Sequence, residues 1–271
     1  MDADAIRFSI FIGALLILGA AEAVWPRRAR VQKRSTRWPV NLFLVFLNGF
    51  LAKLLLGGGA LAVAWHAKEN GWGLLNYYEL PYPLAFAIAF IILDFMIYIQ
   101  HVLTHALPFL WRLHIVHHTD LDLDVTSALR FHPIEIVVSM LYKMALVAAI
   151  GPDPWVVVVF EIVLNMWAQF QHASIHFPEK LDRLIRLFVI SPDMHRIHHS
   201  IETKETNSNF GFFLSIWDRI CGTYRRDPAL PHTEFPIGLT EYRKAEELTL
   251  TSLLIMPAVP KLGAYTMKSD S

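Results

Sequence analysis

The sequence is poor in cysteine and in charge. Among its 271 residues there is one cysteine, Cys221, which excludes an internal disulfide and a cysteine-rich zinc or iron–sulfur module. Charged residues make up 18% of the chain, below the roughly 25% of an average soluble domain. Lysine and arginine balance aspartate and glutamate, 24 against 24, so no overall charge favours nucleic acid as a partner. With 54% hydrophobic residues, the composition is typical of a membrane protein.

Long apolar runs are the main feature that is present. About 20 apolar residues are enough to cross a bilayer as a helix. The Gly57–Gly59 run in the second segment indicates a bend or a close helix contact. The turn sequence GPDP separates the last two runs, which at roughly 17 residues each barely span a bilayer. We predict an all-α integral-membrane bundle with four or five membrane segments and a helical cytoplasmic cap. The runs cover about residues 6–25, 40–65, 83–103, 134–150 and 155–172.

Basic residues in the loops indicate the orientation of these helices. The loop after the first run carries six lysines and arginines, whereas the loop after the second carries only Lys68. Because loops rich in lysine and arginine stay in the cytoplasm, we expect a multi-pass protein with its N-terminus outside and residues 173–271 in the cytoplasm. The six basic residues are Arg27, Arg28, Arg30, Lys33, Arg34 and Arg37.

Histidine is clustered in this chain. Ten of the 13 histidines fall into two pairs and two triplets. Each pair has i, i+4 spacing and each triplet reads H-x-x-H-H, so on a helix at least two rings of every cluster lie on one face. The predicted topology brings all four clusters to the cytoplasmic ends of the helices. The clustered residues are His101, His105, His114, His117, His118, His172, His176, His195, His198 and His199.

Such clusters point to metal binding. Neutral imidazole is the commonest metal ligand in proteins, and ten nitrogens suit two ions with four to five nitrogens each better than one tetrahedral zinc. A bis-histidine haem uses one histidine from each of two helices and leaves the triplets unexplained. A zinc hydrolase needs only three ligands, and a metal transporter should carry its ligands deep along the helices. We interpret His66 and His232 as ordinary polar residues.

Six motifs occur in order: LDFMIYIQHVLTH, LWRLHIVHHTD, TSALRFHPIE, QHASIH, SPDMHRIHHS and NFGFFLSIWDRICGTY. Together they resemble the fatty acid hydroxylase / sterol desaturase superfamily of integral-membrane non-haem di-iron enzymes. The similar stretch runs from about Asp94 to Tyr224, and Cys221 stands where relatives often have an apolar aromatic residue. The single domain, 1–271, is then expected to comprise N-terminal transmembrane helices (1–82), a histidine-box core (83–224) and a C-terminal cytoplasmic tail (225–271).

The resemblance implies a function. It makes the ten clustered histidines ligands of two iron ions, with O2 as co-substrate and zinc as a substitute in purified protein. We therefore expect a monooxygenase that hydroxylates a fatty acyl chain, a sterol or a related lipid. A lipid or sterol desaturase with the same site is the nearest alternative, because the outcome depends on where the C–H bond is held. A non-redox zinc membrane protein is the alternative of another class.

Electrons are expected to come from another protein. The chain has neither a G-x-G-x-x-G motif nor a P-loop, so an external carrier is needed, such as a reductase with ferredoxin or a small cytochrome. Basic residues on the cytoplasmic side form a candidate docking face for an acidic carrier. Alternatively, they contact anionic lipid headgroups or only set the topology of the helices. These residues are Arg112, Arg183, Arg186, Arg196, Arg225 and Arg226.

Polar residues near the histidines are candidates for supporting roles. One helical stripe holds Asp94 and Tyr98 with the first histidine pair, and another holds Glu161 and Asn165 with the second pair. A carboxylate on either stripe can orient a ligand imidazole, with a helix–helix hydrogen bond as the alternative. His132 is a candidate supporting or substrate-contacting residue. Residues expected to hold the cap together are Asn209, Trp217 and Asp218.

Overall fold

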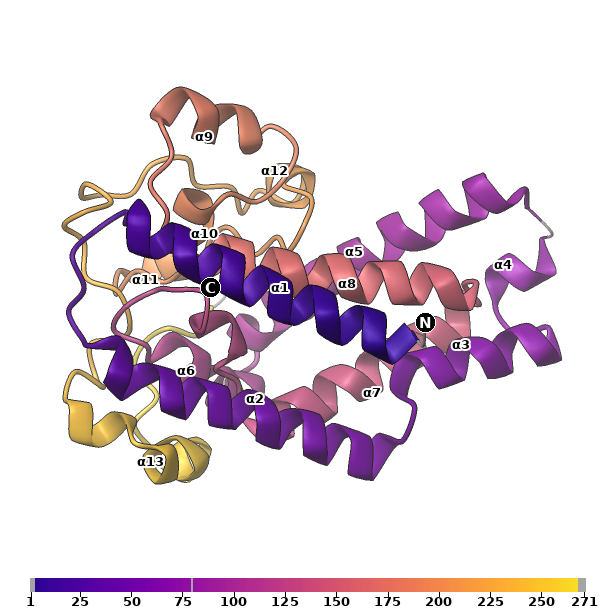
Figure 1. Ribbon diagram of the computed structural model, residues 1–271, viewed down its shortest axis with the longest axis horizontal. Helices are drawn as coiled ribbons and strands as arrows, with labels where there is room; N and C mark the ends of the chain where they lie inside the picture. Colours follow the sequence, from indigo (N-terminus) through magenta and orange to yellow (C-terminus); the bar gives the residue numbers. More distant parts are fainter. Residues whose placement is uncertain (1–2, 79, 268–271) are drawn as a thin grey trace.

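The structure is a computed structural model that describes residues 3–78 and 80–267. Within these residues it is helical, with three isolated β-bridges and no strand. Figure 1 shows long helices side by side, with a cap of short helices and loops at one end. The prediction of an all-α bundle with a helical cap is confirmed. The bundle consists of α1 (Ala3–Val24), α2 (Arg34–Leu56), α3 (Gly59–Asn70), α4 (Leu74–Tyr77), α5 (Tyr82–Ala106), α7 (Pro133–Ile150) and α8 (Pro154–His172).

Four segments are long and apolar enough to cross a membrane: α1, Arg34–Tyr77, α5 and α7. The second of them contains the predicted bend, where Gly57 and Gly59 have φ values of 60° and 57°, which only glycine adopts readily. α8, with 19 residues, is a fifth long helix and packs along α1. The prediction of four or five membrane segments is therefore confirmed, and the structure describes a membrane protein.

Aromatic side chains gather at the end of the bundle opposite the cap. They come from the second half of α3 and the loop after it, from α4 and the residue after it, and from the first residues of α5 and α8. These segments lie at the right of Figure 1. Tryptophan and tyrosine are enriched where a membrane meets water, so this distribution is the one expected at a membrane boundary. The exposed members are Trp65, Trp72, Tyr77, Tyr78, Tyr82 and Trp155.

The cap is built around a short helix that follows α5 directly. Leu107 lies between the two helices as the C-cap of α5 and the N-cap of the next helix. Pro108 is the first residue of that next helix, a position where proline is favoured. The C-terminal stretch folds back onto this helix, and Trp111 Nε1 donates a hydrogen bond to the carbonyl of Leu262. The short cap elements are α6 (Pro108–His118), η1 (Ser127–Leu129), α9 (Glu179–Ile185), α10 (Pro192–His198), α11 (Thr203–Thr206), α12 (Ile216–Ile220), η2 (Ala245–Leu248), α13 (Leu250–Ile255) and η3 (Met256–Ala258).

A buried polar network fastens the loop after α6 to the first two helices. Arg37, which is 3% exposed, donates to both Asp120 and Asp124 at 2.6 Å. Glu22 of α1 accepts the backbone N–H groups of Val125 and Ser174. Removing one partner of such a buried pair costs about 3–5 kcal/mol because a charge is left uncompensated. Arg37 is therefore a structural residue of the fold as well as one of the six basic residues in the loop.

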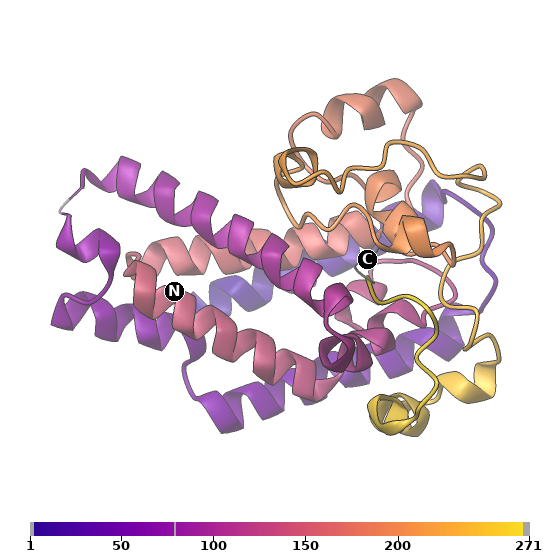
Figure 2. The ribbon, with the colours of Figure 1, turned by 180° about the vertical axis from the view of Figure 1, so that it is seen from behind.

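The loop between α1 and α2 lies at the same end of the molecule as the cap. Arg27 donates to both carboxylate oxygens of Asp193 at 3.0 Å, and Arg28 donates to the carbonyl of Phe235. Seen from behind in Figure 2, the same end also holds the last turn of α5 and the last turn of α8. Nine of the ten clustered histidines therefore meet at one end of the bundle, under the cap.

Candidate metal centre

Four elements carry the histidines into one buried volume. The last two turns of α5 provide His101 and His105, and α8 ends with His172. α6 provides one triplet, and α10 with its C-cap residue His199 provides the other. These elements pack against one another in pairs, α5 on α6 and α8 on α10. Side chains that are far apart in the sequence are thereby brought within reach of shared ions.

Nine of the ten histidines form two compact groups. In each group every residue can offer one ligand atom that lies within 4.8 Å of all the others, and all nine residues are buried. Group A consists of His101, His105, His114, His118 and His198, and group B consists of His117, His172, His195 and His199.

The H-x-x-H-H pattern explains how the triplets are divided. Residues four apart on a helix lie about 40° apart around its axis, whereas the middle histidine is displaced by about 60–100° from both. In the first triplet the i, i+4 pair His114 and His118 joins group A, and His117 turns to group B. In the second triplet the i, i+4 pair joins group B, and His198 turns to group A. Each triplet therefore provides ligands to both groups. The first triplet gives its pair to group A and its middle histidine to group B, and the second triplet does the reverse.

The spacing of ring nitrogens in group B fits a single metal ion. The Nε2 atom of His172 lies 3.1 Å from those of His117 and His195, and Nε2 of His195 lies 3.2 Å from that of His199. Metal–imidazole bonds of about 2.1 Å place neighbouring ligand nitrogens roughly 3.0–3.4 Å apart, depending on the coordination angle. Three successive separations in this range fit nitrogens that converge on one ion.

In group A the outer nitrogen of most rings is held by a specific partner. Nδ1 of His101 contacts the carbonyl of Phe210 at 2.8 Å, and Nδ1 of His198 contacts the carbonyl of Ser208 at 2.9 Å. A carbonyl only accepts, so these Nδ1 atoms donate and leave Nε2 with a free lone pair. The inner Nε2 atoms of His105, His114 and His198 are buried without a hydrogen-bond partner. Buried unpartnered nitrogens with lone pairs are what a metal ion would satisfy.

Two side chains complete this support, and the sequence had not indicated either. Glu135 Oε1 lies 2.6 Å from Nδ1 of His114, and Asn207 Oδ1 lies 3.2 Å from Nδ1 of His105. Glu135 stands in the first turn of α7, where an acidic residue is usually explained by the helix dipole. The nearby motif TSALRFHPIE contains it, but it shares no helix with His114. Asn207 ends α11 in the cap, where no periodic pattern exists.

The electrostatics of the site keep the rings neutral. Burial, reinforced by neighbouring imidazoles, lowers the pKa of His118 and of His199 well below the usual range. The same causes lower the pKa of His117, His195 and His198. Neutral imidazole is the form that binds metals, so both groups are ready for metal ions near neutral pH.

His176 departs from the prediction. The i, i+4 spacing predicts that α8 continues to residue 176, but α8 ends at His172, and Ala173 is extended with ψ 136°. His176 is exposed, and its backbone N–H donates to the carbonyl of Trp25. The structure brings it to neither group, so the prediction that the two histidines share a helix face is wrong.

Asp94 and Tyr98 lie on the predicted face of α5, but they bind the cap rather than histidines. Asp94 Oδ2 accepts hydrogen bonds from Trp217 Nε1 at 2.7 Å and from the backbone N–H of Leu214 at 3.1 Å. The hydroxyl of Tyr98 lies 2.9 Å from that of Thr223. Of the two alternatives for Asp94, the structure therefore shows the hydrogen bond between elements of the fold.

The other supporting candidates are also bound elsewhere. Glu161 forms ion pairs with Lys143 and Arg7, tying α8 to α7 and α1, and it contacts no ligand imidazole. Asn165 donates to the carbonyl of Glu161 within its own helix. His132 caps α7 by accepting from the N–H of Ile134, while its Nε2 lies 3.1 Å from the carbonyl of Leu254. Glu161 and Asn165 on the predicted stripe of α8 therefore bind partners within the helix bundle and not the histidines of the two groups.

The residues expected to hold the cap together do so. Asp218 accepts the backbone N–H groups of Phe210 and Gly211, and Trp217 binds Asp94. Asn209 adopts a positive φ of 55°, and its Nδ2 atom donates to the carbonyls of Met194 and Arg225. This prediction is confirmed.

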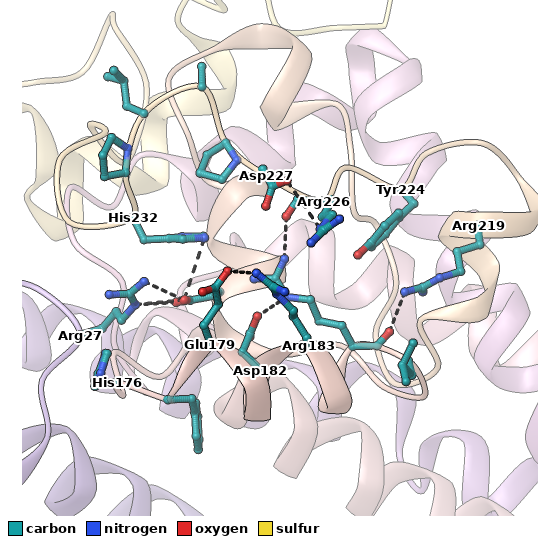
Figure 3. Close-up of a pocket in the computed structure, with 18 residues that line it drawn as sticks. Arg27, His176, Glu179, Asp182, Arg183, Arg219, Tyr224, Arg226, Asp227 and His232 are labelled. Carbon is teal, nitrogen blue, oxygen red and sulfur yellow. Dashed lines mark hydrogen bonds and ion pairs between the residues drawn. The ribbon is translucent and has the colours of Figure 1, made fainter.

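A surface pocket of about 750 Å³ lies beside α9 and contains His176 and His232 (Figure 3). None of the nine grouped histidines lines it. Many of its charges are paired. Figure 3 shows the pair of Arg183 with Glu179, and Asp182 is paired with Arg186. Burial lowers the pKa of His232 to about 3, and the ring lies 3.9 Å from Asp193. The position of His232 outside both groups agrees with its interpretation as an ordinary polar residue. The same holds for His66, which is exposed and lies beside Asn70.

The arginines predicted to form a docking face differ in their exposure. Arg196 is fully buried and paired with Asp193, and Arg186 is 6% exposed and paired with Asp182. Neither can meet another protein, so this part of the prediction is wrong. Arg112 is half-buried and donates to the carbonyls of Pro257 and Val259. The side chains that remain accessible are Arg183, Arg225 and Arg226.

Comparison with known proteins agrees with this architecture. The sequence model of the fatty acid hydroxylase family matches residues 86–223, which include all nine grouped histidines. The ornithine lipid hydroxylase OlsE of Rhizobium tropici is 32% identical over 241 residues, covering 85% of this chain and 70% of its own. No solved structure matches the chain at a significant level.

More distant relatives share mainly the histidine-bearing part. The human alkylglycerol monooxygenase is 28% identical over 159 residues, which cover 58% of this chain and 34% of that protein. The human cholesterol 25-hydroxylase is 26% identical over 137 residues, covering 50% of this chain and 49% of its own. This chain thus spans only about a third to a half of the length of these two relatives. Because the family match covers half of the chain and OlsE aligns with most of it, the protein belongs to the fatty acid hydroxylase family.

Proposed function

We propose that this protein is a membrane-bound, O2-dependent monooxygenase that hydroxylates a lipid. The observation that carries the proposal is the convergence of nine buried histidines into two ligand groups at the end of a membrane bundle. Relatives whose names record the hydroxylation or monooxygenation of ornithine lipids, alkylglycerols and cholesterol support a lipid substrate. OlsE, which aligns over most of the chain, favours a polar membrane lipid over a sterol.

The proposed ligands are the nine histidines, with one metal ion in each group. All-nitrogen sets of five and four exceed the three protein ligands of a catalytic zinc site, and imidazole suits iron. Iron bound there would supply the activation of O2 needed to oxidise an unactivated C–H bond. Purified protein is expected to accept zinc in the same positions, since zinc binds the same nitrogens.

The protein's own residues set the conditions for this chemistry. Glu135, Asn207 and two backbone carbonyls fix the ring orientation of four ligands in group A, so the lone pairs are aimed before an ion binds. The cap covers both groups, and every grouped histidine is at most 5% exposed. A site closed to bulk water protects reactive species from side reactions.

We propose that the cap and the C-terminus face the cytoplasm and that the N-terminus faces the other side. Six basic residues against one in the first two loops support this orientation. The contacts of Arg27 and Arg28 with the cap also support it, because they hold the basic loop at the histidine end. A cytoplasmic cap would be reached by a soluble electron carrier, such as a reductase with a ferredoxin or a small cytochrome.

The test is to compare the lipids of cells with the active gene and cells with a His118→Ala variant. The active protein is expected to add one oxygen atom to a defined lipid, whereas loss of two hydrogen atoms would indicate a desaturase instead. Metal analysis of the purified protein should give about two ions per chain when iron is supplied. An unchanged lipid profile together with a single bound ion would overturn the proposal.

A further inference from the structure

A small crevice opens beside group A on the outer surface of the helix bundle. It has a volume of about 80 Å³ and lies between α5, α6 and α7. Leu103 and Val138, which line it, are 36% and 40% exposed on the outer surface of the bundle, so the crevice has an apolar mouth at the lipid side. Apart from Leu103 and Val138, its lining residues are Gln100, Thr104, Leu110, Leu113, Glu135 and Tyr142.

The inner wall of this crevice is also the outer wall of group A. Gln100, Thr104 and Leu113 directly precede His101, His105 and His114 in the chain. Glu135 touches both sites, because it lines the crevice and its Oε1 atom contacts Nδ1 of His114 at 2.6 Å. A molecule that enters from the lipid side therefore reaches the immediate neighbourhood of three proposed ligands without crossing the cap.

Two acceptor atoms at this wall have no donor. Glu135 Oε2 and Gln100 Oε1 are both buried without a hydrogen-bond partner, and Glu135 as a whole is 7% exposed. An unsatisfied buried acceptor costs about 1–3 kcal/mol, and more when it carries charge. The other lining side chains do not relieve this cost, since the hydroxyls of Thr104 and Tyr142 donate to the carbonyls of His101 and Met96. The crevice thus combines apolar walls with two buried acceptor atoms that have no hydrogen-bond donor.

We propose that this crevice admits the lipid substrate, and that Glu135 and Gln100 select a chain that carries a hydroxyl or amide N–H group close to the carbon that reacts. The inference rests on the proposed function and adds to it a class of substrate and a place of entry. A volume near that of three water molecules fits a slim chain segment with a small polar group, not a fused ring system. The O–H or N–H group of the substrate donates to Gln100 Oε1 or to Glu135 Oε2, while the alkyl chain lies along Leu103 and Val138 toward the bilayer.

Photolabelling of the full-length protein in lipid nanodiscs tests the proposal without requiring turnover. The probes are a hexadecanol with a diazirine next to its hydroxyl end and the matching methyl ether, which cannot donate. The alcohol should label the crevice segments around Leu103, Leu113 and Val138 about three- to tenfold more than the ether does, as expected for one hydrogen bond. Equal labelling by both probes, or labelling elsewhere only, would overturn the proposal.

Two variants sharpen the test. Gln100→Leu should reduce labelling by the alcohol toward that by the ether, whereas Val138→Trp should close the mouth and reduce both. Val159→Trp, on the exposed face of α8, is the matched control and should change neither. If Val138→Trp labels like the wild type, the crevice is not the entry.

Lipid analysis of the same proteins separates this inference from the proposed function. Wild-type protein that forms oxidised lipid but is not labelled in the crevice overturns the entry site alone. Protein that is labelled as expected but forms no oxidised lipid overturns the proposed hydroxylase function and leaves the crevice as a lipid-binding site.

Discussion

The two histidine groups differ in how their rings are held. In group A, four of five outer nitrogens have a partner from Glu135, Asn207 or a backbone carbonyl. In group B only His172 has one, the carbonyl of Ala168, while the Nδ1 atoms of His117, His195 and His199 are buried without partners. Group B is instead held together by close contacts between the Nε2 atoms themselves. The comparison suggests a rule: group A is organised before a metal ion arrives, and group B depends on the ion.

The reason lies in the elements around each group. Group A lies beside α7 and the chain that follows α11, and these segments supply the oxygen atoms that contact its Nδ1 atoms. Group B faces α8 and the buried loop after α6, where Phe131 stacks on the ring of His117 at 4.3 Å between centroids. An aromatic face restricts a ring without fixing which nitrogen carries the proton.

The largest expected effect comes from removing one ligand of each group. His118→Ala and His199→Ala should each abolish product formation and lower the metal content by about one ion, because binding and local folding are coupled. His66→Ala is the control and should change neither, since His66 is exposed at the far end of α3. Metal stoichiometry and lipid product should be measured together. If either variant lost both ions, the two groups would not be independent sites.

A second experiment removes the charged support of group A. Glu135→Gln keeps the size of the side chain but weakens its hydrogen bond to His114, so metal affinity or turnover should fall about 10–100-fold. Glu161→Gln is the matched control on the neighbouring helix. It should affect stability through Lys143 and Arg7 but leave metal affinity unchanged. Equal losses of metal affinity in both variants would contradict the role assigned to Glu135.

Stepwise removal of the metal compares the two groups directly. During titration with a chelator, the ion of group B should leave first, at about one tenth of the chelator concentration needed for group A, since supporting hydrogen bonds typically contribute at least this factor. Spectra and metal analysis of wild-type protein should therefore show two steps. In Glu135→Gln the steps should merge. A single step in the wild type would remove the proposed difference.

The smallest effect concerns pH. Burial lowers the folded-state pKa of His118 and His199, so below the ordinary pKa of about 6.5 the unfolded chain takes up protons that the folded chain does not. These two histidines should therefore not change the stability of the metal-free protein above this pH. Below it they should lower the stability, by up to about 1.4 kcal/mol per pH unit each. Thermal unfolding in detergent at several pH values measures this. His199→Asn should give a shallower decline, and no decline in the wild type would contradict the assignment.

Much of the site could be predicted from the sequence because its signals are local. The apolar runs define the membrane helices, since every backbone group in lipid must be bonded within its own segment. The i, i+4 spacing of His101 with His105, of His114 with His118 and of His195 with His199 correctly predicted rings on a common face. Helical periodicity is a property of a few adjacent residues, so it survives without knowledge of the rest of the fold.

Only the tertiary structure decided which distant residues meet. It turned His117 to group B and left His176 at the surface, because α8 ends one turn earlier than the spacing suggested. It also replaced Glu161 by Glu135 as the carboxylate beside a ligand and buried Arg196 in an ion pair. These outcomes depend on how whole elements pack, as in the contact between Glu135 and His114, which are 21 residues apart in the chain. The sequence by itself therefore determined the ligand type, its spacing and its place at one end of a membrane bundle. Packing decided how the ligands are shared between two groups and what supports them.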